Sequence, residues 1–534
     1  MGIEQSQAAV SLEADVLVIG GGPSGVWAAL SAANEGARVV LADKGFCGSS
    51  GATAPSGTGV WYVQPDAQLR YEAKMSRYEM GGRLAEDSWM NRVLDKAFER
   101  MHNLADWGYP FPVDETGKQV VRGLQGPEYM KLMRKLALKA KVKILDHSPA
   151  LELLADDHGV GGARGVRTQS GEPWEVRAGA VVIATGGCAF LSKALGCNVL
   201  TGDGYLLAAE AGAEMSGMEF SNAYAISPSF SSVTKTAYYR YASFYYEDGT
   251  IVEGAGSQRG RSVIARNLLQ GRQVYARLDQ APEDIIPRLR VGQTNFFLPF
   301  DRHGIDPFKD LFPVTLRLEG TVRGTGGIHI VDENCATIVP GLYAAGDAAT
   351  RELICGGFTG GGSHNAAWAM SSGSFSGRGA AEYALALGVN ATNRNLRGLS
   401  STPLVDRGAA SHAAKTAERV QEIKDVTHPY DRNLFRTESV LDDSLNRLDA
   451  LWKDIRETPV ARDGQAYKAR ESAAMTATTR WMYHSAKRRT ETRGMHKRVD
   501  YPALDAGQRF RLISSGLDDI KVRTAKVAEE VVLV

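Results

Sequence analysis

Four short apolar runs along the chain predict buried strands. Residues 14–19, 37–43, 181–187 and 341–347 consist largely of Val, Ile, Leu, Ala and Gly. Continuous apolar runs of this length are typical of parallel strands that are covered on both faces. The stretch 26–36 between the first two runs predicts a helix, so this part of the chain has the order strand, helix, strand.

A helical pattern returns near the C-terminus. Within residues 438–456 the apolar side chains recur at helical spacing, at Val440, Leu441, Leu445, Leu448, Leu451 and Trp452. The Gly-poor stretch 465–490 also predicts helix. No apolar run reaches the roughly 18 residues that a membrane-spanning helix needs. We therefore expect an α/β part, a helical C-terminal part and no membrane span.

The first strand and helix are joined by a glycine-rich turn. Residues 20–25 read Gly-Gly-Gly-Pro-Ser-Gly and satisfy G-x-G-x-x-G, and the second strand ends at Asp43, all within about 30 residues. Gly20 permits the tight turn, Gly22 lets the backbone approach a pyrophosphate, and Gly25 lets the helix pack closely on the sheet. The helix N-terminus offers free N–H groups to phosphates, and Asp43 can accept hydrogen bonds from ribose hydroxyls. The context predicts a dinucleotide site.

Two distant segments favour FAD over NAD. Residues 181–187 end in a glycine turn, and residues 341–347 end in a small-residue turn followed by Asp347. In flavoproteins with two dinucleotide folds, an acid at this place holds the ribityl chain of FAD. No convincing second G-x-G-x-x-G for NAD(P)H is present. Electrons are therefore expected to travel through oxygen, a quinone or a redox protein.

Composition narrows the class of protein. The 62 basic and 61 acidic residues give a net charge of +1, which argues against a chain-wide nucleic-acid binder. The five cysteines are widely spread and no pair has the two-residue spacing of iron–sulfur or zinc sites, so we expect no metal, no cluster and no disulfide framework. The first residues lack a secretory signal, and a cytoplasmic protein is expected.

The motifs together resemble the flavoprotein-subunit family of succinate dehydrogenase and fumarate reductase, which includes L-aspartate oxidase and the alpha subunit of adenylylsulfate reductase. The resemblance spans roughly residues 14–503. Its most specific part is residues 489–502, RTETRGMHKRVDYP, which is similar to the family signature R-x-E-S-R-G-A-H-x-R-x-D-x-P. Residues 201–204, 326–328 and 340–347 also match, and residues 371–375 look closest to the adenylylsulfate reductase branch.

The resemblance implies a fold and a domain order. The fold would be α/β, with a Rossmann-like FAD domain of the two-dinucleotide-binding type, an inserted α+β capping domain and a C-terminal helical domain. The FAD domain would comprise residues 1–215 and 325–395, the capping domain 216–324 and the helical domain 396–534. A small-molecule substrate and an iron–sulfur or other redox partner protein would complete the system.

The cofactor residues follow from the same motifs. We expect FAD to be held by Gly20, Gly22, Ser24, Gly25, Asp43, Lys44, Ser50, Gly51, Ala52, Thr185, Gly186, Asp203, Gly346 and Asp347. In membrane-bound members of the family a His in an S-H-T segment bonds covalently to the flavin. Gly51 stands at that place here. FAD is therefore expected to be bound without a covalent link.

The dicarboxylate site of the family looks dismantled in this sequence. Tyr224 falls near the His of the F-H-P-T segment, residues 321–325 lack the His that precedes Gly-Gly-Ile, and His364 lies nearest the place of the N-R-L-G arginine. Burying two carboxylates without such donors would be costly. Succinate, fumarate and aspartate are therefore not expected as substrates.

Three residues are candidates for catalysis. Arg261 begins a segment similar to the family's P-R-D-V-V-A-R, whose first Arg moves a proton at the substrate carbon, although Ser262 replaces the relay acid. The alternative is a surface Arg on a helix. His364, which follows a cofactor strand, could bind a substrate oxygen or shuttle a proton, or could be structural. Tyr224 is the next candidate.

Three functions remain open. The first is a FAD-dependent enzyme that moves two electrons at a carbon centre of a substrate that is not a dicarboxylate. The second is an adenylylsulfate-reductase-like subunit that works with an iron–sulfur partner, and the third is a non-catalytic flavin electron-transfer subunit. Residues 238–246 hold six aromatics in nine positions. If some of them line a pocket rather than a core, a larger or aromatic substrate is favoured.

Overall fold

A computed structural model describes residues 10–234, 236–359, 362–405, 413–528 and 531. Its main sheet has the strand order β16-β6-β7-β8-β1-β2-β5, and β15 pairs with the second half of β8. The parallel part follows from the four apolar runs, which form β1 (Val10–Ile19), β2 (Val39–Ala42), β8 (Pro173–Ile183) and β15 (Leu342–Ala344). The sequence-based prediction of these strands is confirmed.

The register of β1 places its apolar residues at the centre of the sheet. Val18 pairs with Leu41 on one side and with Val182 on the other, and all three side chains are buried. The sheet continues through short parallel and antiparallel strands: β5 (Lys143–Leu145), β6 (Ala150–Asp156), β7 (Gly159–Val166) and β16 (Arg397–Gly398).

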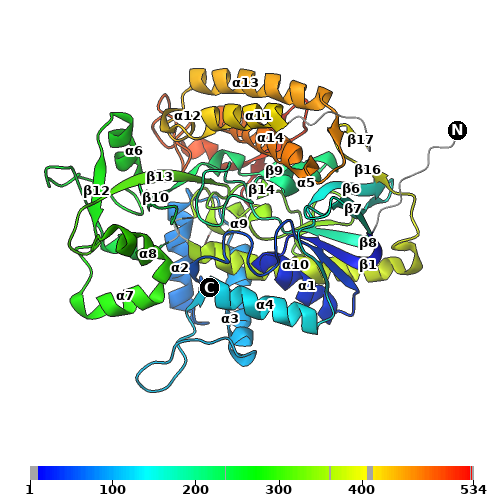
Figure 1. The fold of residues 1–534 in the computed structure, drawn as a ribbon, viewed down its shortest axis with the longest axis horizontal. Coiled ribbons are helices and arrows are strands. Elements are labelled where there is room, and N and C mark those ends of the chain that lie inside the picture. Colours follow the sequence, from blue (N-terminus) through cyan, green and yellow to red (C-terminus); the bar gives the residue numbers. More distant parts are fainter. Residues whose placement is uncertain (1–9, 235, 360–361, 406–412, 529–530, 532–534) are drawn as a thin grey trace.

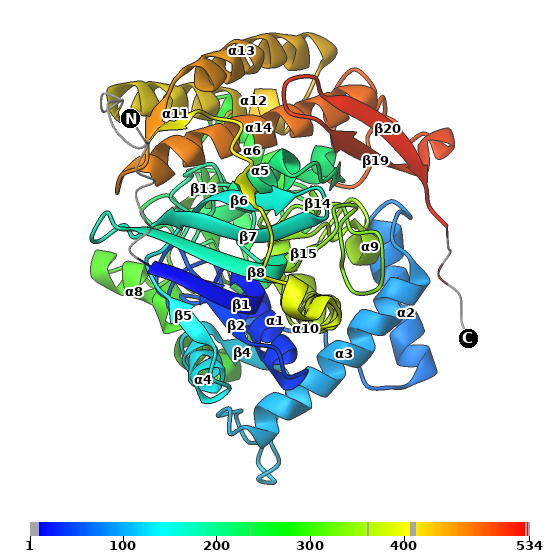
Figure 2. The ribbon, with the colours of Figure 1, turned by 90° about the vertical axis from the view of Figure 1, so that its right-hand side faces the viewer.

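Two helices cover the strands β1 and β8. They are α1 (Pro23–Asn34) and the long α10 (Gly362–Leu387), and small residues bring them close together. A Cβ added at Gly377 of α10 would lie 2.1 Å from the Ala28 carbonyl oxygen of α1, and one added at Gly25 would lie 1.7 Å from the Gly20 carbonyl oxygen. A side chain at either position would push the helix away from its partner, as the motif predicts for Gly25. Figure 2 shows α1 and α10 beside these strands.

Further elements pack around this unit. They are β3 (Gly57–Gly59), α2 (Ala67–Met80), α3 (Asp87–Asp106), β4 (Gly123–Gln125), α4 (Gly126–Lys139), α5 (Asp203–Glu210) and α9 (Glu352–Cys355). The five cysteines are buried free thiols. Among the described residues, no three His, Cys, Asp or Glu side chains are grouped so that they could hold a metal ion.

A second sheet and a core of aromatic side chains lie within residues 216–324, the range that the sequence-based prediction assigns to an inserted capping domain. Its strand order is β10-β13-β12-β11, formed by β10 (Ala223–Pro228), β11 (Ser243–Tyr245), β12 (Val274–Arg277) and β13 (Phe312–Gly320). Its helices are α6 (Arg261–Leu269), α7 (Ile286–Gly292) and α8 (Thr294–His303). Phe296, Phe300 and Phe312 are fully buried. The domain extends to the left of the molecule in Figure 1.

The C-terminal domain is mainly helical. It contains α11 (Ala413–Thr427), α12 (Tyr430–Asn433), α13 (Glu438–Glu457) and α14 (Ala466–Arg488), and the last two match the helices predicted from the sequence. A small sheet of order β14-β9-β19-β20 follows: β9 (Met215–Ser216), β14 (Gly327–Ile328), β19 (Phe510–Ser515) and β20 (Lys521–Lys526). In the described part of the chain, no helix is both long and apolar enough to cross a bilayer.

Candidate active site

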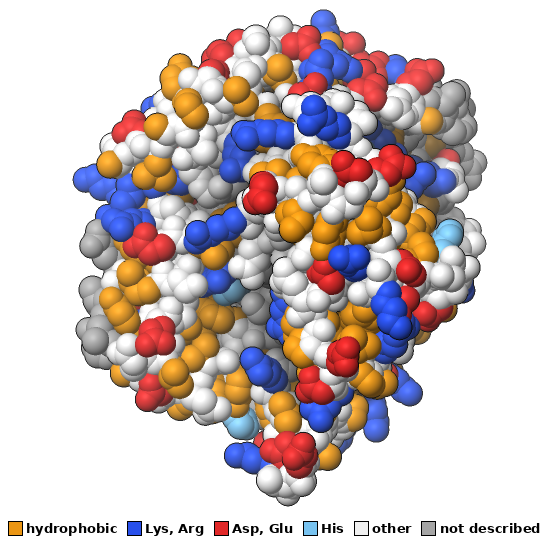
Figure 3. Space-filling view, turned by 90° about the vertical axis from the view of Figure 1, so that its left-hand side faces the viewer, with side chains coloured by type: hydrophobic (Ala, Val, Ile, Leu, Met, Phe, Trp, Pro, Cys, Tyr) orange, Lys and Arg blue, Asp and Glu red, His pale blue; other side chains and the backbone are white. Residues whose placement is uncertain are grey.

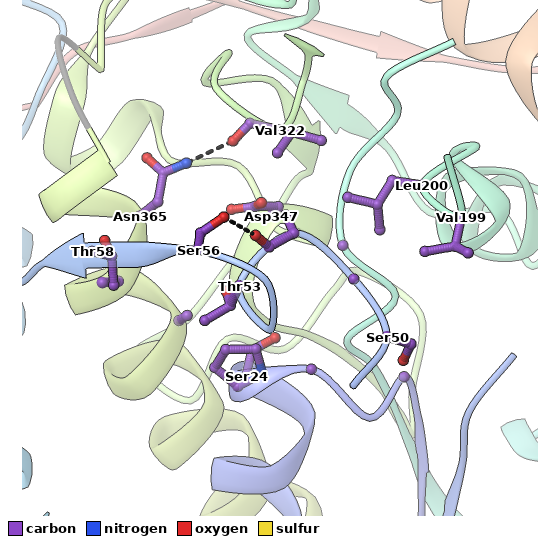
Figure 4. A pocket seen from close by; sticks show the side chains of 18 of the residues that line it. Ser24, Ser50, Thr53, Ser56, Thr58, Val199, Leu200, Val322, Asp347 and Asn365 are labelled. Carbon is purple, nitrogen blue, oxygen red and sulfur yellow. Dashed lines mark hydrogen bonds between the residues drawn. The ribbon is translucent and has the colours of Figure 1, made fainter. Parts of the chain in front are cut away.

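A cavity of about 440 Å³ lies beyond the ends of β1, β2 and β8. Its walls come from the Gly20–Ser24 turn, residues 50–53 and 56–59, and residues from the capping domain. Figure 4 shows Ser24 at the start of α1, with Val199 and Leu200 on another wall. This is the edge at which parallel α/β sheets bind ligands.

The glycine turn leaves room for a ligand next to the backbone. A Cβ added at Gly22 would meet no protein atom within 4 Å, although Gly22 lines the cavity. Gly22 is also the N-cap of α1, and no side chain caps the helix there. Free N–H groups at a helix start favour an anion such as a pyrophosphate. The turn therefore fits a dinucleotide.

Gly51 also faces open space. A Cβ there would meet nothing within 4 Å, and the φ of +86° is one that glycine adopts without strain. Since Gly51 has no side chain, it offers no atom for a covalent bond to a flavin.

Asp43 organises the loops at the end of β2. Its Oδ2 accepts a hydrogen bond from the Gly21 N–H at 2.5 Å. Its Oδ1 accepts from the Gly45 N–H at 2.6 Å and from the Ser50 hydroxyl at 2.9 Å. The carboxylate thus ties the glycine turn to residues 45–50 while it lines the cavity.

Lys44 joins two domains through a buried ion cluster. Its Nζ lies 2.6 Å from Asp203 and 2.7 Å from Glu471, and it donates a hydrogen bond to Thr201 at 2.9 Å. Burial lowers the pKa of Lys44, but the attraction of the two carboxylates is larger, so the pKa of Lys44 is raised overall. Burial raises the pKa of Glu471. Sequence reasoning missed Glu471, because no local pattern marks a residue 427 positions away along the chain.

The Asp347 turn is fixed by hydrogen bonds to its backbone and by Arg351. Asp347 forms an ion pair with the buried Arg351, whose Nη2 donates to the Thr321 carbonyl at 2.8 Å. The Gly346 N–H donates to Ser372 at 2.9 Å, and the indole of Trp368 donates to the Gly346 carbonyl at 2.9 Å. Ser372, which belongs to the segment 371–375 that resembles adenylylsulfate reductase, therefore helps to hold this turn.

Most of the expected cofactor residues come together at one cavity. The residues that line it are Gly20, Gly22, Ser24, Asp43, Lys44, Ser50, Gly51, Ala52, Thr185, Gly186, Asp203 and Asp347. Gly25 and Gly346 lie behind this wall, where their small size permits close contacts with Gly20 and Ser24.

A second cavity, of about 410 Å³, adjoins the first between the capping domain and the C-terminal domain. Gln258, Arg261 and Arg323 line both cavities. Arg261 begins α6, and its Nε and Nη1 donate to the carbonyls of Ser257 at 2.7 Å and Tyr224 at 3.0 Å. Burial and the nearby charge of Arg323 lower the pKa of Arg261 to about 10.

The other two catalytic candidates have different surroundings. Tyr224 lines the second cavity, but its hydroxyl donates to the carbonyls of Thr427 at 2.9 Å and His428 at 3.0 Å. Burial raises the pKa of Tyr224 well above its usual value. His364 is buried with its ring centroid 4.8 Å from that of Trp61, and its neighbours Ser363 and Asn365 line the first cavity.

Sequence reasoning missed two further polar residues at the junction. The side-chain amide of Asn365 donates to the Val322 carbonyl at 2.6 Å (Figure 4). Arg323 lies 3.0 Å from the fully buried Glu319, which also accepts a hydrogen bond from Thr234 at 2.6 Å. Arg323 lies in the stretch 321–325, which sequence reasoning searched only for a histidine, and Asn365 directly follows His364. The roles of both residues depend on how the capping domain meets the FAD domain.

Comparison with known proteins agrees with this architecture. Residues 15–228 match the FAD binding domain, and residues 427–527 match the fumarate reductase flavoprotein C-term. One component of the fumarate reductase (CoM/CoB) of Methanothermobacter marburgensis is 24% identical over 92% of this chain and 95% of its own. The fumarate reductase flavoprotein subunit of Mycobacterium tuberculosis is also 24% identical, over 92% of each chain.

Solved structures have the same fold. The quinol fumarate reductase of E. coli superposes with a TM-score of 0.80 and 21% identity over 97% of each chain. The adenylylsulfate reductase of Archaeoglobus fulgidus superposes with a TM-score of 0.77 and 18% identity over 99% of each chain. The resemblance stated from the motifs, the fold class and FAD as cofactor are confirmed. The chain is an FAD-dependent oxidoreductase that carries an FAD binding domain and a fumarate reductase flavoprotein C-term, and it is similar over most of its length to fumarate reductase flavoprotein subunits.

Proposed function

We propose that the protein carries out a two-electron oxidation or reduction at a carbon centre of a substrate that is not a dicarboxylate. The observation that carries the proposal is the position of Arg261, which lines both the cofactor cavity and the second cavity. A proton carrier for a flavin reaction has to stand at such a junction, since hydride and proton move at neighbouring substrate atoms. In this proposal residues 216–324 are the capping domain that brings Arg261 there.

The residues of the first cavity would hold FAD without a covalent bond. The Gly20–Ser24 turn and the start of α1 would bind the pyrophosphate, and Asp347 would orient the ribityl chain. When bound, FAD supplies the acceptor or donor of two electrons. Lys44 and Arg351 are already paired with carboxylates in the described structure. They would fix the walls of the site rather than neutralise the phosphates.

Arg261 would hold and move the proton. A guanidinium is normally a poor acid because its pKa lies above about 12. Burial and the charge of Arg323 bring the pKa of Arg261 down to about 10, which makes the release of a proton easier. Its Nε and Nη1 bind backbone carbonyls. These two bonds fix the plane of the guanidinium, and in this proposal Nη2 carries the proton that is exchanged with the substrate.

Two observations support a substrate other than succinate or fumarate. The Tyr224 hydroxyl is engaged by two backbone carbonyls, so it does not replace a histidine donor. Val322 and Arg323 line the first cavity from the stretch where the family has its second histidine; Val322 is apolar, and Arg323 is already paired with Glu319 at 3.0 Å. The names of the relatives favour the opposite view, because several of them are called fumarate reductases.

The test is anaerobic stopped-flow spectroscopy of the FAD-loaded protein. We expect succinate and L-aspartate to leave the flavin oxidised, and fumarate to leave the photoreduced flavin reduced. A panel of other carbon substrates would then identify the compound that changes the redox state. Rapid reduction by succinate would refute the non-dicarboxylate part of the proposal. Turnover of adenylyl sulfate with an iron–sulfur partner would favour the sulfur-centred alternative.

A further inference from the structure

The second cavity carries a large excess of positive charge. Its lining includes Arg259, Arg261, Arg323 and Lys497, and only one acid, Glu79. Glu79 is already paired with Arg83 at 2.9 Å. The face of the molecule that carries the capping domain is hollowed, and Lys and Arg side chains gather at the rim of this hollow (Figure 3).

The four cationic side chains differ in which groups of the protein offset their charge. Arg323 has a carboxylate partner, Glu319, at 3.0 Å. Arg261 binds the backbone carbonyls of Ser257 and Tyr224, which carry no net charge. For Lys497 and Arg259 the described residues provide no carboxylate within 4 Å. Arg259 is exposed, but Lys497 is partly buried, and burial and the nearby charge of Arg266 lower the pKa of Lys497.

The position of Lys497 within the C-terminal signature is informative. Its charged neighbours are committed to internal contacts: Arg493 pairs with Glu491 at 2.6 Å, and Arg498 pairs with Asp500 at 2.8 Å. His496 is buried and lies 2.9 Å from Arg436. Lys497 occupies a position that the signature leaves open, and its side chain lines the cavity. Half-buried charge without a counter-ion is unfavourable unless a ligand supplies one.

The rest of the lining is suited to the body of an organic molecule. Met80, Phe358, Leu434 and Met495 give the cavity apolar walls. A pocket that combines apolar walls with a few polar groups binds small organic ligands, and the polar groups fix their orientation. The cations then set which end of the ligand enters this cavity.

We propose that the second cavity binds one oxyanion group of the substrate, a carboxylate, sulfonate or phosphate, with Lys497 and Arg259 as its counter-charges. This inference rests on the proposed function, because it assigns to Arg261 the reacting end of the same molecule. The substrate accordingly carries one oxyanion group on an apolar body. Lys497 and Arg259 select for its charged end, and the reacting carbon lies toward the junction with the cofactor cavity.

Isothermal titration calorimetry of the FAD-loaded protein tests this site without turnover. The probes are acetate, methanesulfonate and inorganic phosphate, each titrated at constant ionic strength. The wild type is compared with Lys497→Met, Lys497→Arg and Arg259→Gln. The control is Lys521→Met, since Lys521 is 80% exposed and lies on β20 away from the cavity. FAD content and thermal unfolding show that each variant is folded.

The loss of one charge-assisted hydrogen bond should weaken binding by about tenfold or more in Lys497→Met. Lys497→Arg should keep most of the affinity, and Lys521→Met should bind like the wild type. The probe that binds most tightly identifies the oxyanion. The proposal would be overturned if Lys497→Met and Arg259→Gln bound the probes as tightly as the wild type. It would also be overturned if the wild type bound none of the probes.

Failure of this inference can be distinguished from failure of the proposed function. Calorimetry on the oxidised protein reports the anion site even if succinate or fumarate is found to react. Conversely, a neutral substrate turned over equally well by the wild type and Lys497→Met would overturn the anion site and leave the carbon-centred oxidoreductase intact.

Discussion

Arg489 and Glu219 form an ion pair of 2.9 Å across 270 residues of the chain, and neither side chain is exposed. The same guanidinium pairs with Glu491 at 2.9 Å and donates to the carbonyls of Gln508 and Phe510. Glu219 precedes the first strand of the capping domain, whereas Arg489 directly follows α14. The pair therefore locks the C-terminal domain to the base of the cap.

Removal of the ion pair between Arg489 and Glu219 should destabilise the protein strongly. Breaking a buried ion pair leaves an uncompensated charge and costs about 3–5 kcal/mol. We expect Arg489→Gln to lower the free energy of unfolding by that order in urea titrations followed by circular dichroism. The control is Lys96→Gln, which removes a partly exposed pair with Glu99 and should cost at most about 1 kcal/mol. Equal stability of the two variants would contradict the role of the pair.

FAD retention should depend on Gly22. Its Cβ position is empty of protein atoms, so Gly22→Val should fold, but its side chain would enter the space that we assign to the pyrophosphate. We expect this variant to lose most of its flavin, measured as the ratio of flavin absorbance to protein absorbance in the purified protein. Gly464→Val is the control, because an added Cβ there meets no atom closer than 3.6 Å and lies away from the cavity.

The flavin of the wild type should also be released by acid. Gly51 offers no side-chain atom for a covalent link. After precipitation with trichloroacetic acid, the yellow colour should remain in the supernatant. Flavin fluorescence in the protein band of a denaturing gel would show a covalent link elsewhere.

Glu352 should make stability depend on pH near neutrality. Burial and the neighbouring Glu219 raise the pKa of Glu352 from 4.5 to about 7. Between these two values the folded protein holds a proton that the unfolded chain has lost, so this group makes stability fall as pH rises from about 4.5 to 7. Above about 7 its contribution is constant.

Glu352→Gln should remove this part of the pH dependence. The amide oxygen can still accept the Ser216 hydroxyl, which lies 2.7 Å from the carboxylate in the wild type. Relative to the wild type, the variant should therefore gain stability as pH rises through this window, measured by chemical unfolding at several pH values. The exposed Glu115→Gln is the control, and a pH-independent difference between Glu352→Gln and the wild type would disprove the assignment.

The sequence predicts the elements that local pattern decides. The strands β1, β2, β8 and β15 are continuous apolar runs, and α13 and α14 have helical periodicity or helix-forming composition. The glycine turn is also local, because its spacing alone determines how close a strand and a helix can lie. These features depend on neighbouring residues, so they can be read without knowledge of the fold.

The side-chain partners across domains could not be predicted in this way. Glu471 reaches Lys44 from α14, and Glu319 pairs with Arg323 where the capping domain returns to the FAD domain. Tyr224 could be aligned with a family histidine, but its position in the sequence does not show that its hydroxyl turns to the carbonyls of Thr427 and His428. Such contacts are set by the packing of whole domains.

Proton transfer provides the last prediction. General acid–base catalysis is worth about 10²–10⁴-fold in rate, so Arg261→Gln should keep FAD and slow flavin reduction or reoxidation by at least about 100-fold once a substrate is found.

In the direction that reduces the substrate, the guanidinium is the acid, and the wild-type rate should fall as pH rises through the Arg261 pKa of about 10. In Arg261→Gln this decrease of the rate with pH should be absent. His364→Ala tests the other candidate, and a pH dependence of the rate that this variant alone removes would assign the proton to the imidazole. Tyr224→Phe is the matched control, because its hydroxyl binds backbone carbonyls; it should cost about 1 kcal/mol of stability and leave the rate nearly unchanged. Full speed in Arg261→Gln and His364→Ala, with a large loss in Tyr224→Phe, would transfer the role to the tyrosine.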